Sequence, residues 1–104
     1  MFQPLRRLQA FTQEHFPCLV SPIDNALIIE IGYCQEQGRP LTLKGLLLLK
    51  LGAPATVRRR LKRLVDLGLV HKRRASHDRR LYHLEIDSSV RTRFAKYLKL
   101  ISRL

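Results

Sequence analysis

Apolar residues recur at helical spacing near the start of the chain. Leu5, Leu8 and Phe11 share one face if residues 2–16 are wound as a helix. Pro17 would end that helix, because proline lacks the backbone N–H that continues the hydrogen-bond ladder. The pattern therefore predicts a first helix over residues 2–16.

The next amphipathic stretch begins with a helix start signal. Ser21 can cap the first turn, and Pro22 suits the first helical position, where an N–H would have no partner in any case. The stretch runs to Gly38, after which Arg39-Pro40 would break a helix. Its apolar positions are Ile23, Ala26, Leu27, Ile31 and Cys34.

A third predicted helix is short and unusually apolar. Thr42 can cap residues 43–51, and Gly52 can end them. A surface helix of this length needs one apolar stripe, yet only two of these residues are charged. Leu48 and Leu49 therefore belong to the core, or they meet another element or another subunit.

A fourth helix is predicted from Pro54 to Leu67, with Gly68 just beyond its end. Its inward face carries Val57, Leu61, Leu64 and Val65. Its opposite face carries Ala55, Thr56, Arg59, Lys62, Arg63 and Asp66, with Arg58 and Arg60 on the flanks. One side of this helix is expected to pack and the other to be cationic.

The helical period gives way to alternation after Gly68. Residues 69–86 are typical of a hairpin, with Tyr82, Leu84 and Ile86 alternating after the turn-forming residues 75–78. Asp87 can then cap a last helix. The apolar face of that helix carries Val90, Phe94, Tyr97, Leu98, Ile101 and Leu104.

The order of these elements predicts a winged helix-turn-helix. It is a mainly α fold in which the short helix over residues 43–51 and the basic helix over residues 54–67 precede a small β-hairpin wing. With 104 residues the chain has room for a single domain over 1–104.

The distribution of charge points to a polyanionic partner. The chain holds 20 Lys and Arg against 8 Asp and Glu, but residues 1–53 are nearly neutral, with five basic and four acidic groups. Residues 54–80 carry ten basic groups against Asp66 and Asp78, a concentrated positive field that suits double-stranded DNA. A merely solvated charged surface is the alternative. The ten are Arg58, Arg59, Arg60, Lys62, Arg63, Lys72, Arg73, Arg74, Arg79 and Arg80.

Distinct roles are expected for these side chains on DNA. Arg59 is the candidate for a guanine contact in the major groove, and Thr56 for a thymine methyl group or a phosphate. Arg79 or Arg80, just past the hairpin turn, is placed to enter a minor groove. Phosphate contacts are expected from Arg58, Arg60, Lys62 and Arg63, and further DNA contacts from Lys72, Arg73 and Arg74.

Residues 41–87 resemble the DNA-binding core of the MarR (multiple antibiotic resistance regulator) family. That pattern has Leu-Thr at its start, a Gly ten residues on, Thr-Val and Arg in the recognition helix, Gly-Leu-Val at its end and Asp-Arg-Arg in the wing. The matching residues are Leu41-Thr42, Gly52, Thr56-Val57, Arg59, Gly68-Leu69-Val70 and Asp78-Arg79-Arg80.

This resemblance implies a homodimeric transcription regulator, usually a repressor. It implies that Arg80 enters the minor groove while Asp78 orients it, and that flanking helices in 1–17 and 88–104 form the dimer. Many members also bind a small-molecule effector between the dimerisation and DNA-binding parts. The chain departs from the pattern at Ala53-Pro54, where a polar cap is common.

Two other functions are compatible with these residues. A non-regulatory DNA binder in replication or DNA architecture would have the same fold, and a protein-interaction module could use the apolar helix at Leu46–Leu49. Cys18 and Cys34 suit a redox sensor or small apolar positions, and their spacing fits neither a disulfide framework nor zinc.

Several classes of protein lack support in the sequence. The recognised catalytic motifs are missing, so neither an enzyme nor a cofactor is expected. His71, His77 and His83 are not spaced like metal ligands, so no metal is expected. No apolar stretch approaches the roughly 20 residues of a membrane span, and a cytoplasmic protein is expected.

Overall fold

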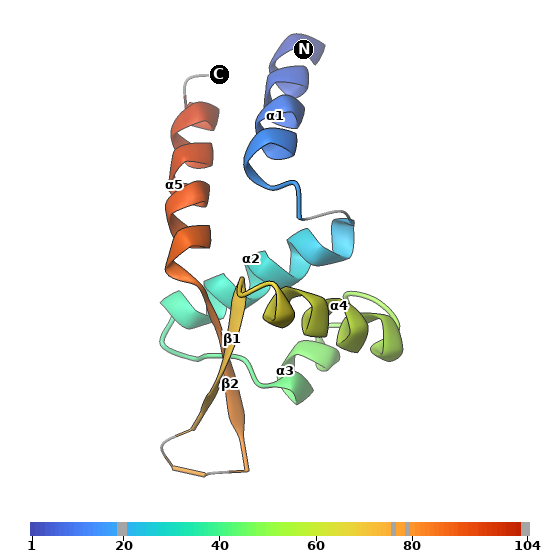
Figure 1. Ribbon diagram of the computed structural model, residues 1–104, viewed down its shortest axis with the longest axis vertical. Coiled ribbons are helices and arrows are strands. Elements are labelled where there is room, and N and C mark those ends of the chain that lie inside the picture. Colours follow the sequence, from blue (N-terminus) through green and yellow to red (C-terminus); the bar gives the residue numbers. More distant parts are fainter. Residues whose placement is uncertain (19–20, 76, 79, 103–104) are drawn as a thin grey trace.

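The computed structural model describes residues 1–18, 21–75, 77–78 and 80–102, and within them it forms a mainly helical fold with one β-hairpin (Figure 1). This arrangement confirms the predicted fold class. Its elements are α1 (Phe2–His15), α2 (Pro22–Glu36), α3 (Leu43–Leu48), α4 (Pro54–Asp66), β1 (Val70–Arg74), β2 (Tyr82–Ile86) and α5 (Ser88–Ser102).

The helices begin where the sequence places their caps. The Ser21 hydroxyl accepts from the Asp24 N–H at 3.2 Å, and the Thr42 hydroxyl accepts from the Gly45 N–H at 3.1 Å. The helix α4 begins at Pro54 with Ala53 as its N-cap and therefore has no side-chain cap. Although Ala53 stands where the family pattern commonly has a polar cap, α4 begins at Pro54 as predicted.

Two helices end in the left-handed turn that glycine favours. Gly68 follows α4 with φ +76°, while Leu69 N–H donates to the Leu64 carbonyl and Gly68 N–H to the Val65 carbonyl. These two bonds are the Schellman pattern. Gly38 ends α2 in the same way, with φ +73°.

The helix α3 is shorter than predicted. It ends at Leu48 instead of Leu51, because the chain turns at Lys50, whose φ of 55° is left-handed. This turn brings the chain round to the start of α4. Leu48 is 69% exposed and Leu49 is also exposed, so neither belongs to the core of the single chain.

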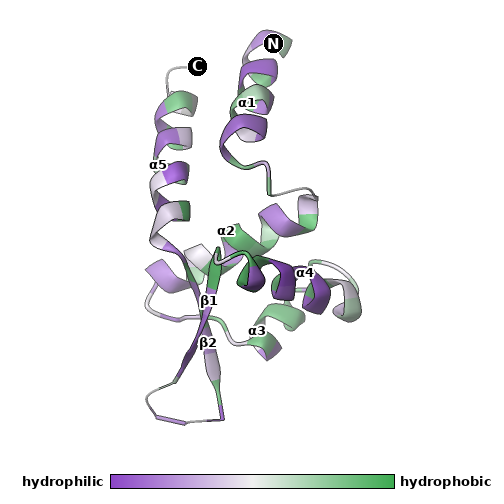
Figure 2. Cartoon of the chain, viewed as in Figure 1, coloured by the Kyte–Doolittle hydropathy of each residue, from purple (hydrophilic) through white to green (hydrophobic). Residues whose placement is uncertain are grey.

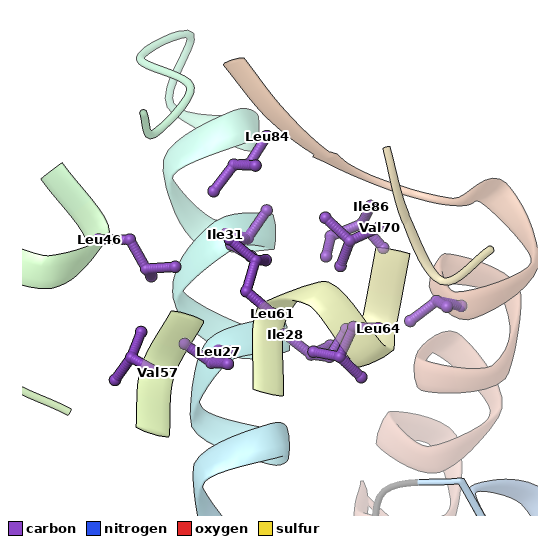
Figure 3. Packing of buried hydrophobic residues seen from close by; sticks show 11 residues of the cluster. Leu27, Ile28, Ile31, Leu46, Val57, Leu61, Leu64, Val70, Leu84 and Ile86 are labelled. Atoms are coloured by element: carbon purple, nitrogen blue, oxygen red, sulfur yellow. The ribbon is translucent and has the colours of Figure 1, made fainter. Parts of the chain in front are cut away.

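The core lies where α2, α3 and α4 meet the inner end of the hairpin (Figure 3). α4 contributes the buried side chains of Val57, Leu61 and Leu64 as expected. From α2 come Leu27 and Ile31, which were predicted, and Ile28, which was not. Its largest fully buried apolar side chains are Leu27, Ile31, Leu46, Leu64, Leu84, Val57 and Val70.

The hairpin is fastened to the helices at its inner end. β1 and β2 pair antiparallel from Val70 opposite Ile86 to Arg74 opposite Tyr82. The Leu84 N–H donates to the Leu41 carbonyl at 2.8 Å, and the Ile86 N–H donates to Oε1 of Gln35 at 2.8 Å. The wing is thus anchored by β2, while its outer end projects away from the helices (Figure 1).

The first and last helices run side by side on the other side of the body (Figure 1). Their contact is aromatic, with ring centroids 5.6 Å apart for Phe11 and Tyr97. Val90 is buried as predicted and Phe94 is half-buried, but Leu98 is exposed. The side chains predicted at 101 and 104 lie outside the described part of the chain.

Candidate nucleic-acid interface

The outer side of α4 is polar and basic, whereas its inner side is apolar (Figure 2). Arg58, Arg59 and Lys62 are exposed on it. The Lys62 ammonium lies 2.9 Å from Oδ2 of Asp66, one turn further along, and the hydrogen bond and charge of that carboxylate raise the pKa of Lys62. Within the described residues, Arg58 and Arg59 take part in no ion pair.

Arg60 and Arg63 lie differently from the other cations of α4. Both are half-buried and point toward α2, where Nη1 of Arg60 lies 3.6 Å and Nη1 of Arg63 lies 3.4 Å from Oδ2 of Asp24. Arg63 also donates to the Cys18 carbonyl at 2.6 Å. These two guanidinium groups are therefore engaged within the protein.

Thr56 lies in the first turn of α4 and is half-buried. Because Ala53 offers no side-chain acceptor, the amide groups of this first turn are not capped by a side chain. Thr56 and the neighbouring amides share the end of α4 that carries the partial positive charge of the helix dipole.

The wing carries basic side chains on β1 and at its tip. Lys72, Arg73, Arg74 and Arg80 are exposed. Arg73 pairs with Glu85 across the hairpin, and the guanidinium carbon of Arg74 lies 5.5 Å from the ring centroid of Tyr82. These cross-strand contacts limit the conformations of two of the four cations.

Asp78 and Arg80 form a small structure at the tip. Oδ1 of Asp78 accepts from the Arg80 backbone N–H at 2.9 Å and from its Nε at 3.3 Å. These hydrogen bonds lower the pKa of Asp78. Asp78 thereby holds the Arg80 side chain, which is the geometry that an orienting role needs. The candidate Arg79 lies outside the described residues.

The three wing histidines have different surroundings. Nε2 of His71 lies 2.7 Å from Oδ1 of Asp87, so His71 is bound to the residue that caps α5. The rings of His77 and His83 have centroids 6.0 Å apart. Across the ranges that the structure describes, no three His, Cys, Asp or Glu side chains form a cluster that could hold a metal ion.

A groove of about 420 Å³ lies between α2 and α5, away from the basic surface. Apolar side chains of both helices line it, and its volume is within the usual range for small-molecule sites. Ile29, Tyr33 and Leu98 are large apolar lining residues that remain exposed.

Sequence reasoning missed Asp24 and Gln35. In the sequence, Asp24 is an ordinary acidic residue in the first turn of α2. Its partners Arg60 and Arg63 lie 36 and 39 positions further along the chain. Gln35 reads as a polar residue near a helix end. Its bond to Ile86 spans 51 positions, and periodicity carries no information over such separations.

Together, α3, α4 and the hairpin define a class of protein: a helix-turn-helix followed by a two-stranded wing. Comparison with solved structures identifies the fold in more detail. A crystal structure of MarR is 21% identical, with a TM-score of 0.64 over 96% of this chain and 71% of that one. A transcriptional regulator from Thermotoga maritima is also 21% identical, with a TM-score of 0.69 over 97% and 75%.

A third structure is a mutant MarR from E. coli complexed with operator DNA. It is 15% identical, with a TM-score of 0.63 over 96% of this chain and 69% of that one. No family model and no curated protein matches the sequence. The chain therefore has the winged helix-turn-helix fold of the MarR structures. In the part of the chain that the structure describes, none of the helices combines the length and the apolar composition of a membrane span.

Proposed function

We propose that the chain is a cytoplasmic, sequence-specific DNA-binding regulator of the MarR type that acts as a repressor. The observation that carries this proposal is the two-sided α4, whose inner face is buried in the core while Arg58, Arg59 and Lys62 project from the outside. A helix of this kind fits the major groove of B-DNA.

Roles on DNA follow from position on α4. Arg59 lies opposite the buried Val57 and Leu61 and so extends furthest from the core, which favours a bidentate contact with guanine. Arg58 and Lys62 flank it and neutralise phosphates. Thr56, in the first turn, contacts a phosphate or a thymine methyl group.

The wing adds contacts beside the major groove. Arg80, which Asp78 holds at the tip, enters the adjacent minor groove. Arg79 is the alternative candidate for this contact. Lys72, Arg73 and Arg74 lie on β1 and contact the sugar-phosphate backbone.

The functional unit in this proposal is a homodimer formed through α1 and α5. The 14 residues of α1 include none that is buried, although Leu5, Leu8 and Phe11 line one face of it. A second copy would cover this surface and would place two α4 helices about one helical turn apart on a pseudo-palindromic operator.

The groove between α2 and α5 is where a small-molecule effector would bind. It adjoins α5, the proposed dimer helix, and Ile86 of the wing also lines it. A small molecule bound in this groove would change the angle between the dimer helices and the DNA-binding elements.

The test separates base reading from phosphate contact. Arg59→Ala should lower affinity for the best duplex obtained by selection from random sequences about 10-fold or more, and leave affinity for random duplex much less affected. Lys62→Ala should weaken binding to both duplexes alike and flatten the salt dependence by about one unit. Affinities are measured by fluorescence anisotropy over a salt series.

Three outcomes bear on the proposal. A palindromic sequence from the selection supports the regulator. Selection without any consensus supports the non-regulatory DNA binder of replication or architecture. DNA binding that is absent at low salt, while the exposed Leu48 and Leu49 still bind a protein, would identify an interaction module instead.

A further inference from the structure

A buried carboxylate holds two arginines of α4. The side chain of Asp24 has no exposed surface, and its Oδ2 lies within 3.6 Å of both Arg60 and Arg63. Its other oxygen, Oδ1, has no hydrogen-bond partner within the described part of the chain. The buried negative charge of Asp24 is therefore balanced chiefly by these two guanidinium groups.

The two arginines are restrained as well as neutralised. Their side chains are 26% exposed for Arg60 and 34% for Arg63, and Arg63 is further fixed by its bond to the Cys18 carbonyl. To reach a DNA phosphate, each would have to turn away from Asp24. Leaving a buried charge without its partner is strongly unfavourable, because water is excluded from it. A phosphate thus competes with Asp24 for both groups.

Sequence-independent attraction to DNA depends on how many cations are free to meet phosphates. Specific recognition depends instead on the ratio of affinities for the right and the wrong sequence. Two fewer phosphate contacts weaken binding to every sequence without removing a base contact. Because both affinities fall by the same factor, this ratio is unchanged, and what falls is the absolute affinity for random DNA.

We propose that Asp24 is a positioning residue, which withholds Arg60 and Arg63 from DNA phosphates and so lowers the sequence-independent affinity of the protein for DNA. The inference rests on the proposed DNA-binding function and assigns these arginines differently from the sequence pattern, which grouped them with Arg58 and Lys62. Asp24 acts through the arginines and does not itself touch DNA.

The first experiment replaces Asp24 by asparagine in the full chain. Asp24→Asn keeps the size of the side chain and removes its charge, so Arg60 and Arg63 become free to turn outward. The plot of log affinity for random duplex against log salt should steepen by about two units, since each phosphate contact contributes roughly 0.9. Between about 50 and 200 mM salt, the variant should lose roughly tenfold more affinity than the native chain.

A second set of variants distinguishes withheld arginines from a general change of structure. Arg63→Gln should leave the salt slope of the native chain unchanged but should lower that of Asp24→Asn by about one unit. Lys62→Gln is the matched control on the exposed side of α4, and it should lower the slope by about one unit in both backgrounds. A merely structural role for Asp24 predicts no such dependence on background.

Two results would overturn the inference. One is an Asp24→Asn chain, folded by circular dichroism, whose salt slope equals or falls below that of the native chain. The other is a native chain whose slope drops when Arg63 is replaced, and this measurement stands even if Asp24→Asn does not fold. A native chain without salt-dependent DNA binding would instead overturn the proposed function itself.

Discussion

At the scale of single residues, Asp87 connects three parts of the molecule. Its carboxylate accepts from the N–H of Ser89 at 3.0 Å and lies 2.7 Å from Nε2 of His71. Its backbone N–H donates to the Leu69 carbonyl at 2.9 Å. The start of α5, the beginning of β1 and the segment after α4 are therefore joined through one residue.

The ionised form of Asp87 should stabilise the fold in a definite pH range. Hydrogen bonds from Ser89, and then from His71, lower the pKa of Asp87 from 3.8 to about 2. Because this pKa is depressed by folding, the stabilisation is present above about pH 4 and is lost as the pH falls toward 2. Asp87→Asn should therefore unfold at lower urea than the native chain at pH 7, and the difference should shrink toward pH 2.

Urea unfolding of both chains from pH 2 to 7 measures this difference. Ser89→Ala removes one of the two donors of Ser89 and should show the same trend with a smaller amplitude. Equal stability of the native and Asp87→Asn chains throughout the range would show that the hydrogen bonds to Asp87 contribute nothing to folding.

At the scale of elements, the end of α4 determines where the wing begins. Gly68 reverses the chain with φ +76°, and the Leu69 N–H returns to the Leu64 carbonyl. Val70, two residues further on, is already buried against the core. One turn of backbone thus couples α4 to β1.

Replacing Gly68 by alanine should destabilise the protein by about 1 kcal/mol, because an L side chain is disfavoured in the left-handed region. A Cβ at Gly68 would meet no atom within 4 Å, so steric overlap does not enter. Gly32→Ala, inside α2, is the control and should not lower stability, since alanine favours a helix and its Cβ would lie 3.4 Å from Ile86. Urea midpoints compare the two, and a Gly68→Ala chain as stable as the native one would contradict the argument.

At the scale of the whole molecule, the chain is elongated, with extents of 48 × 26 × 22 Å. The pair of α1 and α5 projects from the helical body at one end and the wing at the other (Figure 1). Apolar side chains remain exposed on α1, where Phe2 is 77% and Leu5 is 51% exposed. An apolar face of this kind on a projecting helix favours burial against a second copy.

If the protein is a homodimer, a substitution in the apolar face of α1 should lower the mass of the species in solution from that of a dimer toward that of a monomer. Leu5→Lys should shift the protein toward the monomer and weaken binding to a two-half-site duplex, because a charge would be placed in an apolar interface. Gln9→Lys adds the same charge at an exposed polar position of α1 and should have a smaller effect. Sedimentation velocity over a range of concentrations measures the oligomeric state of both variants. A native chain that is monomeric at every concentration would contradict the proposed homodimer.

Local pattern accounts for most of the architecture. The starts of α2, α3 and α4 follow from Ser21, Thr42 and Pro54, and the ends of α2 and α4 follow from glycines that take left-handed conformations. These features depend on neighbours within one or two turns, so the sequence contains all that is needed to place them. The alternation in β2 placed the wing for the same reason.

The sequence by itself also determined that α4 has an apolar side and a cationic side, because helical periodicity fixes which residues share a face. Only the tertiary structure decided which of those cations remain available. Arg59 and Arg60 are adjacent in sequence, yet one is exposed and the other lies beside Asp24. Charge pairing across 36 positions depends on how α2 packs against α4, and that packing is a property of the folded chain.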